Sequence, residues 1–130
     1  MKTFDIIVIG SGAGLMVIEA ALSAGMSCAI IEKSKFGGTC LTKGCIPSKM
    51  LVYPADLVRE SEKADRVGIG FSKPIVDWNK ISKRMWDQIN HNIQIENSLK
   101  KVENLQVYKG IAEFTGKKTL RVKYDDNSFS

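Results

Sequence analysis

The sequence is poor in the residues that stapled secreted domains and metal sites depend on. Its 130 residues include three cysteines, three prolines and one histidine. Three unevenly spaced cysteines are too few for a secreted disulfide framework. Zinc sites favour two separated pairs of ligands, and no second pair is present, so we expect no metal. The length allows about one domain, and 44% apolar residues are enough for it to bury a core.

Long apolar runs and charged blocks are also missing. No segment approaches the ~20 apolar residues of a membrane span. The apolar run at residues 4–9 contains an acid and ends at a glycine, unlike an export signal. The net charge is +5, but no basic block is longer than two residues, whereas nucleic-acid interfaces concentrate their basic residues. We therefore expect a cytoplasmic protein that binds neither membranes nor nucleic acid.

The first third of the sequence has the pattern of a strand–turn–helix–strand unit. Residues 4–9 form a β-branched run typical of a strand buried on both faces of a parallel sheet. Apolar residues at helical spacing follow over residues 15–24, and Gly25 suits the end of that helix. Residues 27–32 resemble a second buried strand. This pattern predicts a Rossmann-like α/β fold with a parallel sheet.

The remaining residues add long helices and a β-hairpin to this α/β fold. Pro54 is expected to kink a helix over residues 49–63, and Asp77 to cap a second helix whose apolar stripe, Trp78 included, packs in the core. Trp86 is expected to pack as well. The predicted strands are residues 105–109 and a hairpin of residues 112–114 and 119–124.

Three glycines lie in the turn between the first strand and its helix. Gly10, Gly12 and Gly14 let a pyrophosphate approach the helix N-terminus, whose free N–H groups favour anions. Leu15 replaces the last glycine of the G-x-G-x-x-G pattern, so we expect a slightly displaced helix with the phosphate site kept. Glu32 ends the second strand, where an acid binds a ribose diol. The alternative is a sharp turn in an ordinary α/β domain with Glu32 as a surface acid, and the spacing alone does not separate NAD from FAD.

Cys40 and Cys45 are separated by four residues, which is unsuited to a disulfide within a regular helix. Helical Cα atoms five residues apart lie ~8.6 Å from each other, whereas a disulfide needs less than about 7 Å. The pair can therefore bridge only if the backbone between the cysteines is irregular, which Gly44 and Pro47 permit. Structural disulfides are rare in cytoplasmic proteins, so we favour a redox role.

The segment Gly37-Gly38-Thr39-Cys40-Leu41-Thr42-Lys43-Gly44-Cys45-Ile46-Pro47-Ser48-Lys49 resembles the active-site signature of the FAD-dependent pyridine nucleotide–disulfide oxidoreductases of class I. By this motif the chain is similar to dihydrolipoamide dehydrogenase, mercuric reductase and mycothione reductase. Most members have Asn where this chain has Thr42. Residues 110–114 resemble the adenine-side strand of the family, so the resemblance extends over the whole chain.

The resemblance implies roles for individual residues. Cys40 would be the thiol that exchanges with the substrate, Cys45 the thiol that faces the flavin, and Lys49 a residue that tunes the flavin ring. Both thiols would need a lowered pKa, to which Lys49 would contribute. The residues implied to line FAD are Gly10, Gly12, Gly14, Glu32, Lys33, Thr39, Lys49 and Ala112. Outside the motif, we expect Cys28 to be a buried apolar residue and His91 an exposed helix residue.

The resemblance also implies a larger enzyme than this chain. Residues 1–130 would be the N-terminal part of an FAD-binding domain, apparently truncated, without the NAD(P)-binding and dimerisation domains, and inactive alone. The whole enzyme would be a homodimer that moves electrons between NAD(P)H, FAD, the cysteine pair and a small or protein-bound disulfide or dithiol, most like dihydrolipoamide dehydrogenase. The alternatives are a mercuric or mycothione reductase activity and an isolated flavin or thiol module without catalysis.

Overall fold

The computed structural model describes residues 1–129, which divide into two compact units. The first unit comprises Met1–Gly38 and the described part of Asn92–Ser130, and the second comprises Thr39–His91. Within residues 1–129, no helix is long and apolar enough to cross a membrane.

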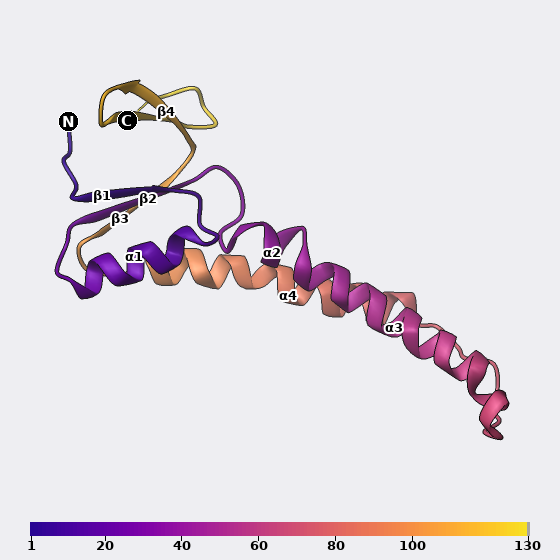
Figure 1. Cartoon of the computed structure of the whole chain (residues 1–130). Coiled ribbons are helices and arrows are strands. Elements are labelled where there is room, and N and C mark those ends of the chain that lie inside the picture. The colour runs from indigo at the N-terminus through magenta and orange to yellow at the C-terminus, as the bar shows by residue number, and fades with distance from the viewer. Residues whose placement is uncertain (130) are drawn as a thin grey trace. The chain divides into compact units, whose positions relative to one another are not determined.

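The first unit contains a three-stranded parallel sheet in the order β1-β2-β3 (Figure 1). Strand β1 (Ile6–Ile9) pairs with β2 (Cys28–Glu32), and β2 pairs with β3 (Leu105–Lys109). Helix α1 (Gly14–Ser23) connects β1 to β2 and contacts both strands. The predicted strand–turn–helix–strand unit and the third strand are confirmed.

The core of the first unit lies between this sheet and its helices. All five residues of β2 are buried, because β2 is the central strand. Cys28 is fully buried, as predicted, and burial together with the nearby charge of Asp5 raises the pKa of its thiol. The buried core cluster consists of Ile18, Ala21, Cys28, Ile30 and Phe36.

The prediction that the first strand is buried on both faces is wrong for β1. Ile6 and Val8 pack against the core, whereas Ile7 and Ile9 are 37% and 53% exposed. β1 is an edge strand of the sheet, and its alternate side chains point to opposite faces. Among the described residues, only one of those faces is covered.

Strands β4 (Ile111–Gly116) and β5 (Thr119–Lys123) form the predicted antiparallel hairpin. After β5 the chain turns back, and Phe129 pairs with Lys123 in an isolated bridge. The Arg121 guanidinium lies 4.7 Å from the centre of the Phe129 ring.

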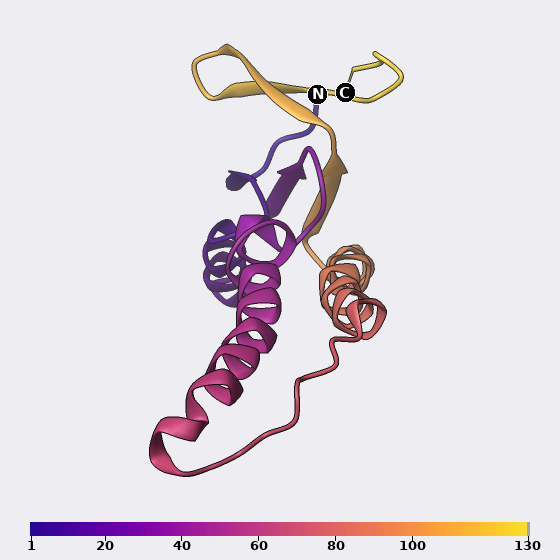
Figure 2. The same ribbon diagram turned by 90° about the vertical axis from the view of Figure 1, so that its right-hand side faces the viewer.

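The second unit is mainly helical. It contains the end of α2 (Gly38–Thr42), α3 (Cys45–Lys63), the 3-10 helix η1 (Ala64–Val67) and the start of α4 (Trp78–Leu99). Figure 2 shows the long irregular segment that joins η1 to α4. α3 begins four residues earlier than predicted and continues through Pro54, and α2 was not predicted. Asp77 caps α4 as predicted: its Oδ1 accepts a hydrogen bond from the Lys80 N–H at 3.0 Å.

Packing along α4 is less complete than its apolar stripe predicts. Ile89 is 3% exposed, but Trp78 and Trp86 are 60% and 50% exposed. In a small helical unit, neighbouring elements bury only one face of a helix. The expectation that both tryptophans pack in the core is therefore wrong, because half or more of each side chain is exposed. His91 is exposed on this helix, as predicted.

Candidate functional site

The glycine-rich turn lies where β1 ends and α1 begins. The Gly10 N–H donates to the Ile31 carbonyl at 2.8 Å, which continues the β1–β2 pairing into the turn. Helix α1 starts after Ala13, which provides no side-chain cap. The Leu15 and Met16 N–H groups donate to the Gly12 and Ala13 carbonyls at 3.1 Å, so an anion would approach the N–H groups of the turn that precede them.

A second glycine-rich segment approaches this turn. Gly38 has a φ of +73°, and a Cβ atom built there would lie 2.4 Å from the Cα atom of Gly12. No side chain fits between the two backbones at this point. Main chain alone therefore borders the turn at this point, which suits a phosphate group that must come close to backbone N–H groups.

Gly14 makes the close contact between helix and strand. A Cβ atom at Gly14 would lie 2.3 Å from Cγ1 of Val8 in β1. In the G-x-G-x-x-G pattern the last glycine allows this close packing, and that position is Leu15 in this chain. The structure makes the contact one residue earlier, and Leu15 packs against the core cluster.

Glu32 is buried, not a surface acid, and it is bound to the glycine-rich turn. Its Oε2 accepts hydrogen bonds from the Ser11 N–H at 2.9 Å and from the Ser11 hydroxyl at 2.7 Å. Its Oε1 accepts one from the Ser34 N–H at 2.9 Å. Burial raises the pKa of Glu32, but the hydrogen bonds from Ser11, Ser34 and Lys33 outweigh burial and hold this pKa below its usual value.

Ser11 is a site residue that the sequence analysis missed. It is fully buried, and its hydroxyl also accepts a hydrogen bond from the Gly37 N–H at 3.1 Å. Ser11 therefore joins both glycine-rich segments to Glu32. The available signal was a hydroxyl residue two positions after the first strand and an acid at the end of the second. The carboxyl ends of parallel strands meet at one edge of the sheet, so the two side chains could be expected to lie close together.

The other residues predicted to line the cofactor are more dispersed. Lys33 is exposed directly after β2, and Ala112 is partly buried in β4. The Gly110 N–H donates to the Glu32 carbonyl at 2.9 Å, which ties the start of the hairpin to the end of β2. Thr39 and Lys49 lie in the second unit, both exposed. The structure thus brings together the three predicted glycines and Glu32.

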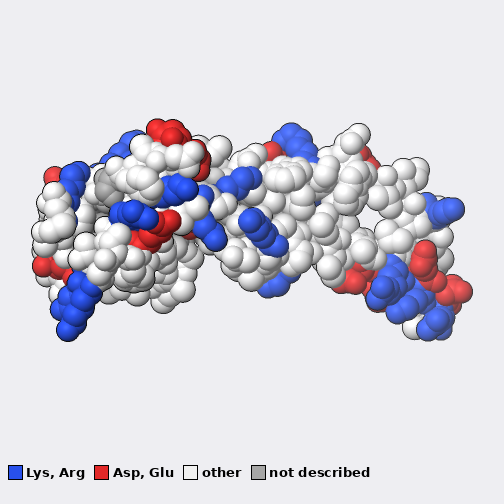
Figure 3. Space-filling view, turned by 90° about the horizontal axis from the view of Figure 1, so that it is seen from above, with Lys and Arg blue, Asp and Glu red and all other residues white. Residues whose placement is uncertain are grey.

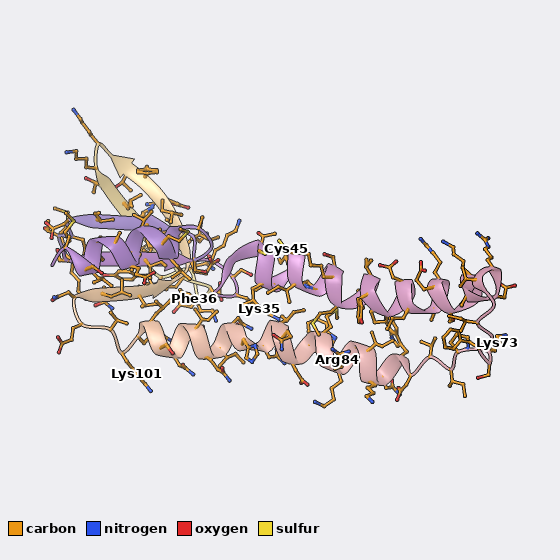
Figure 4. The ribbon with its side chains drawn as sticks, turned by 60° about the horizontal axis from the view of Figure 1, so that its bottom comes forward. Lys35, Phe36, Cys45, Lys73, Arg84 and Lys101 are labelled. Carbon is orange, nitrogen blue, oxygen red and sulfur yellow. The ribbon has the colours of Figure 1, made fainter. Side chains whose placement is uncertain are left out.

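The cysteine pair lies across a break between two helices. α2 ends at Thr42 and α3 begins at Cys45 (Figure 4). Gly44, between them, has φ −124° and ψ −110°, far from helical values. This irregular backbone brings the two thiols into a hydrogen bond, which a regular helix would prevent. Both cysteines are exposed and reduced.

The expectation of a lowered pKa is wrong for Cys40 in this dithiol form. The hydrogen bond with the Cys45 thiol raises the pKa of Cys40, and some loss of hydration and the charge of Cys45 act in the same direction. The Lys49 ammonium acts in the predicted direction but is too weak to reverse this. Cys45 is the first residue of a 19-residue helix, a position that favours negative charge on a side chain.

The second unit also contains an apolar cavity of about 810 Å³. It is lined by side chains of α3, of α4 and of the segment between them, including Leu51, Phe71, Trp78, Ile81 and Arg84. None of the predicted site residues lines it.

Among residues 1–129 there is no cluster of three His, Cys, Asp or Glu side chains that could hold a metal ion.

Comparison with known proteins agrees with this arrangement. The profile of the pyridine nucleotide-disulphide oxidoreductase family matches residues 4–128. A dihydrolipoyl dehydrogenase from Buchnera aphidicola is 32% identical over 97% of this chain and 27% of its own length. A mycothione reductase from Mycobacterium tuberculosis is 39% identical over 69% of this chain and 19% of its own length.

A solved structure shows the same fold. The Cu(II) complex of the HOCl-induced flavoprotein disulfide reductase RclA from Escherichia coli matches 100% of this chain and 26% of its own, with a TM-score of 0.74 and 27% identity. The chain thus spans about a quarter or less of the length of these proteins. Homologues in this family depend on FAD and use NAD(P)H as co-substrate. With its family profile matched over residues 4–128, the chain belongs to the pyridine nucleotide-disulphide oxidoreductases.

Proposed function

We propose that this chain is the N-terminal part of the FAD-binding domain of a flavoprotein disulfide oxidoreductase whose activity is closest to that of dihydrolipoyl dehydrogenase. The observation that carries the proposal is the contact between the Cys40 and Cys45 thiols across the break between α2 and α3. The dihydrolipoyl dehydrogenase and mycothione reductase relatives support the reaction class. In the whole protein we propose a cytoplasmic homodimer that acts on a disulfide or dithiol.

The residues of the first unit fit the cofactor. The turn that contains Gly10, Gly12 and Gly14 carries no side chain at these positions, so a pyrophosphate could approach its backbone there. A carboxylate has about four acceptor positions. Glu32 accepts hydrogen bonds from Ser11, Ser34 and Lys33, so a ribose hydroxyl would share or replace one of these bonds. We assign supporting contacts to Lys33, Thr39, Lys49 and Ala112.

When bound, FAD supplies two-electron transfer between a nicotinamide and a disulfide. The chain's own thiols carry out the exchange with substrate. The Cys40 thiolate attacks one sulfur of the substrate disulfide, forms a mixed disulfide and releases the first substrate thiolate. The Cys45 thiolate then attacks the Cys40 sulfur and releases the second. The substrate gains two electrons, the Cys40–Cys45 disulfide forms, and the two thiol protons go to the released thiolates.

The proposal is tested on protein expressed from its complete reading frame and loaded with FAD. We expect NADH to bleach the flavin absorbance and the protein to reduce a disulfide substrate. Cys40→Ser and Cys45→Ser should each abolish disulfide reduction, while Cys28→Ser, at a buried position outside the exchange, should keep it. Bound flavin that NADH leaves unchanged would instead favour a module without catalysis. Disulfide reduction at the wild-type rate in both serine variants would refute the proposal.

A further inference from the structure

The segment that contains the cysteine pair carries positive charge without acids to balance it. Residues 33–55 include four lysines and no Asp or Glu. Two of these, Lys43 and Lys49, belong to the second unit and lie two residues before and four residues after Cys45. Over α2 and the first turns of α3, the face shown in Figure 3 carries basic side chains and little acidic surface.

The charges of these lysines are available to a substrate. Both side chains are exposed. The four salt bridges found within residues 1–129 involve neither lysine. The Lys49 ammonium acts on the Cys40 thiol, so its charge reaches the reacting sulfurs. Gly44 gives α3 no side-chain cap, so the positive end of the helix dipole adds to the same potential at Cys45.

We propose that the Cys40–Cys45 pair prefers disulfides with carboxylates close to their sulfurs over cationic disulfides of the same size, and that Lys43 is a residue that determines this specificity. The inference rests on the proposed function. Positive charge beside the thiols raises the local concentration of an anionic substrate. It also stabilises the negative charge that develops on the departing sulfur during exchange.

The exchange reaction itself keeps atoms and electrons balanced for every substrate compared. One protein thiolate bonds to a substrate sulfur as the substrate S–S bond breaks. The second thiolate displaces the remaining substrate thiolate as the Cys40–Cys45 bond forms. Two electrons pass from the protein dithiol to the substrate in each case, so only the charge of the substrate differs.

The test uses the reduced chain and three disulfides of similar size. Dithiodipropionate is anionic, bis(2-hydroxyethyl) disulfide is neutral and cystamine is cationic. The formation of the Cys40–Cys45 disulfide is followed by acid quenching and mass spectrometry. The measured quantity is the ratio of the rate with dithiodipropionate to the rate with cystamine, which cancels changes in the reactivity of the thiols.

We expect this ratio to fall stepwise from wild type to Lys43→Gln to Lys43→Glu, by about threefold or more for the glutamate. Salt near ~1 M should reduce the difference between the variants, because it screens charges on the surface. The matched control is Lys63→Glu, which makes the same charge change at the far end of α3 and should leave the ratio unchanged. Lys43→Gln keeps a neutral polar side chain, so an effect there does not depend on tolerance of the glutamate.

Two results would overturn the inference in different ways. Equal ratios in Lys43→Glu and Lys63→Glu, with normal oxidation by the neutral disulfide, would refute the preference for anionic disulfides. The redox role of Cys40 and Cys45 would still stand. Failure of the neutral disulfide to produce any Cys40–Cys45 bond in the wild-type chain would overturn the proposed function and this inference together.

Discussion

Glu32 and Ser11 are joined by two hydrogen bonds to a single carboxylate oxygen, one from the Ser11 N–H at 2.9 Å and one from its hydroxyl at 2.7 Å. The pair connects the end of β2 to the turn between β1 and α1. The Ser11 hydroxyl also accepts from Gly37, so one buried residue orders both glycine-rich segments. The shape of the candidate phosphate site therefore depends on a side chain that need not touch the cofactor.

Ser11→Ala tests this dependence. The substitution removes the hydroxyl and leaves the Gly37 N–H and part of the Glu32 carboxylate without their partner. We expect the free energy of unfolding to fall by about 1–3 kcal/mol, measured by urea denaturation. Ser23→Ala is the control, because the exposed Ser23 hydroxyl bonds only to a carbonyl of its own helix. Equal losses in the two variants would contradict the role given to Ser11.

The pH dependence of stability should report the state of Glu32. Its pKa in the folded chain is below its ordinary value of 4.5, so the unfolded chain binds more protons as the pH falls through that range. The stability that Glu32 contributes is present above the unfolded value and is lost as the pH falls towards the folded value. Asp5, Glu96 and Asp126 also have lowered pKa values and contribute in the same direction.

Glu32→Gln should therefore give a shallower loss of stability on acidification than wild type. The measurement is a series of urea denaturation curves from about pH 6 to about pH 3, which spans the range where carboxyl groups titrate. Asp126→Asn provides a comparison at an exposed carboxylate in the turn after β5. Parallel curves for wild type and Glu32→Gln would show that folding does not lower the pKa of Glu32.

Gly38→Ala tests the close approach of the two glycine-rich segments. The new methyl group would overlap Gly12, and the positive φ would add a cost of ~1–2 kcal/mol. We expect a clear loss of stability and of FAD binding, the latter followed by quenching of flavin fluorescence. Gly68→Ala, with φ +81° and open space, should show the cost of the dihedral alone. Gly70→Ala, with open space and no positive φ, should be neutral or slightly stabilising.

The raised pKa of Cys40 can be tested by removing its causes separately. Cys45→Ala deletes the hydrogen bond that raises the pKa most, so the Cys40 thiolate should form at lower pH and react faster with iodoacetamide near neutral pH. Lys49→Met should shift the pKa of Cys40 upward, while Lys63→Met should not. An unchanged pH profile of alkylation in Cys45→Ala would contradict the contact between the two thiols.

The sequence predicted the sheet, the connecting helix and the cysteine pair because each depends on local pattern. The β-branched run, the glycines and the C-x₄-C spacing all act within a few residues. The exposed face of β1 was missed because Ile7 and Ile9 have the same apolar side chains as buried strand residues. What covers a strand depends on elements distant in the sequence, which a local pattern does not contain.

Long-range hydrogen bonds were missed for the same reason. Ser11 and Glu32 are 21 residues apart, and a single serine in a glycine-rich turn does not identify its partner. α3 begins earlier than predicted because Gly44 has a non-helical backbone conformation. This break ends the helical path of α2, and a new helix can begin at Cys45. The pKa of Cys40 depends on the contact between the Cys40 and Cys45 sulfurs. The C-x₄-C spacing permits this contact but does not predict that it forms.

The most direct measurement of the central claim is a redox titration of the chain in thiol buffers, with the disulfides mapped by peptide mass spectrometry. We expect one reversible two-electron transition that joins Cys40 to Cys45, with Cys28 reduced throughout because it is fully buried. Cys40 and Cys45 that take up separate mixed disulfides with the buffer thiol, and never bond to each other, would contradict it.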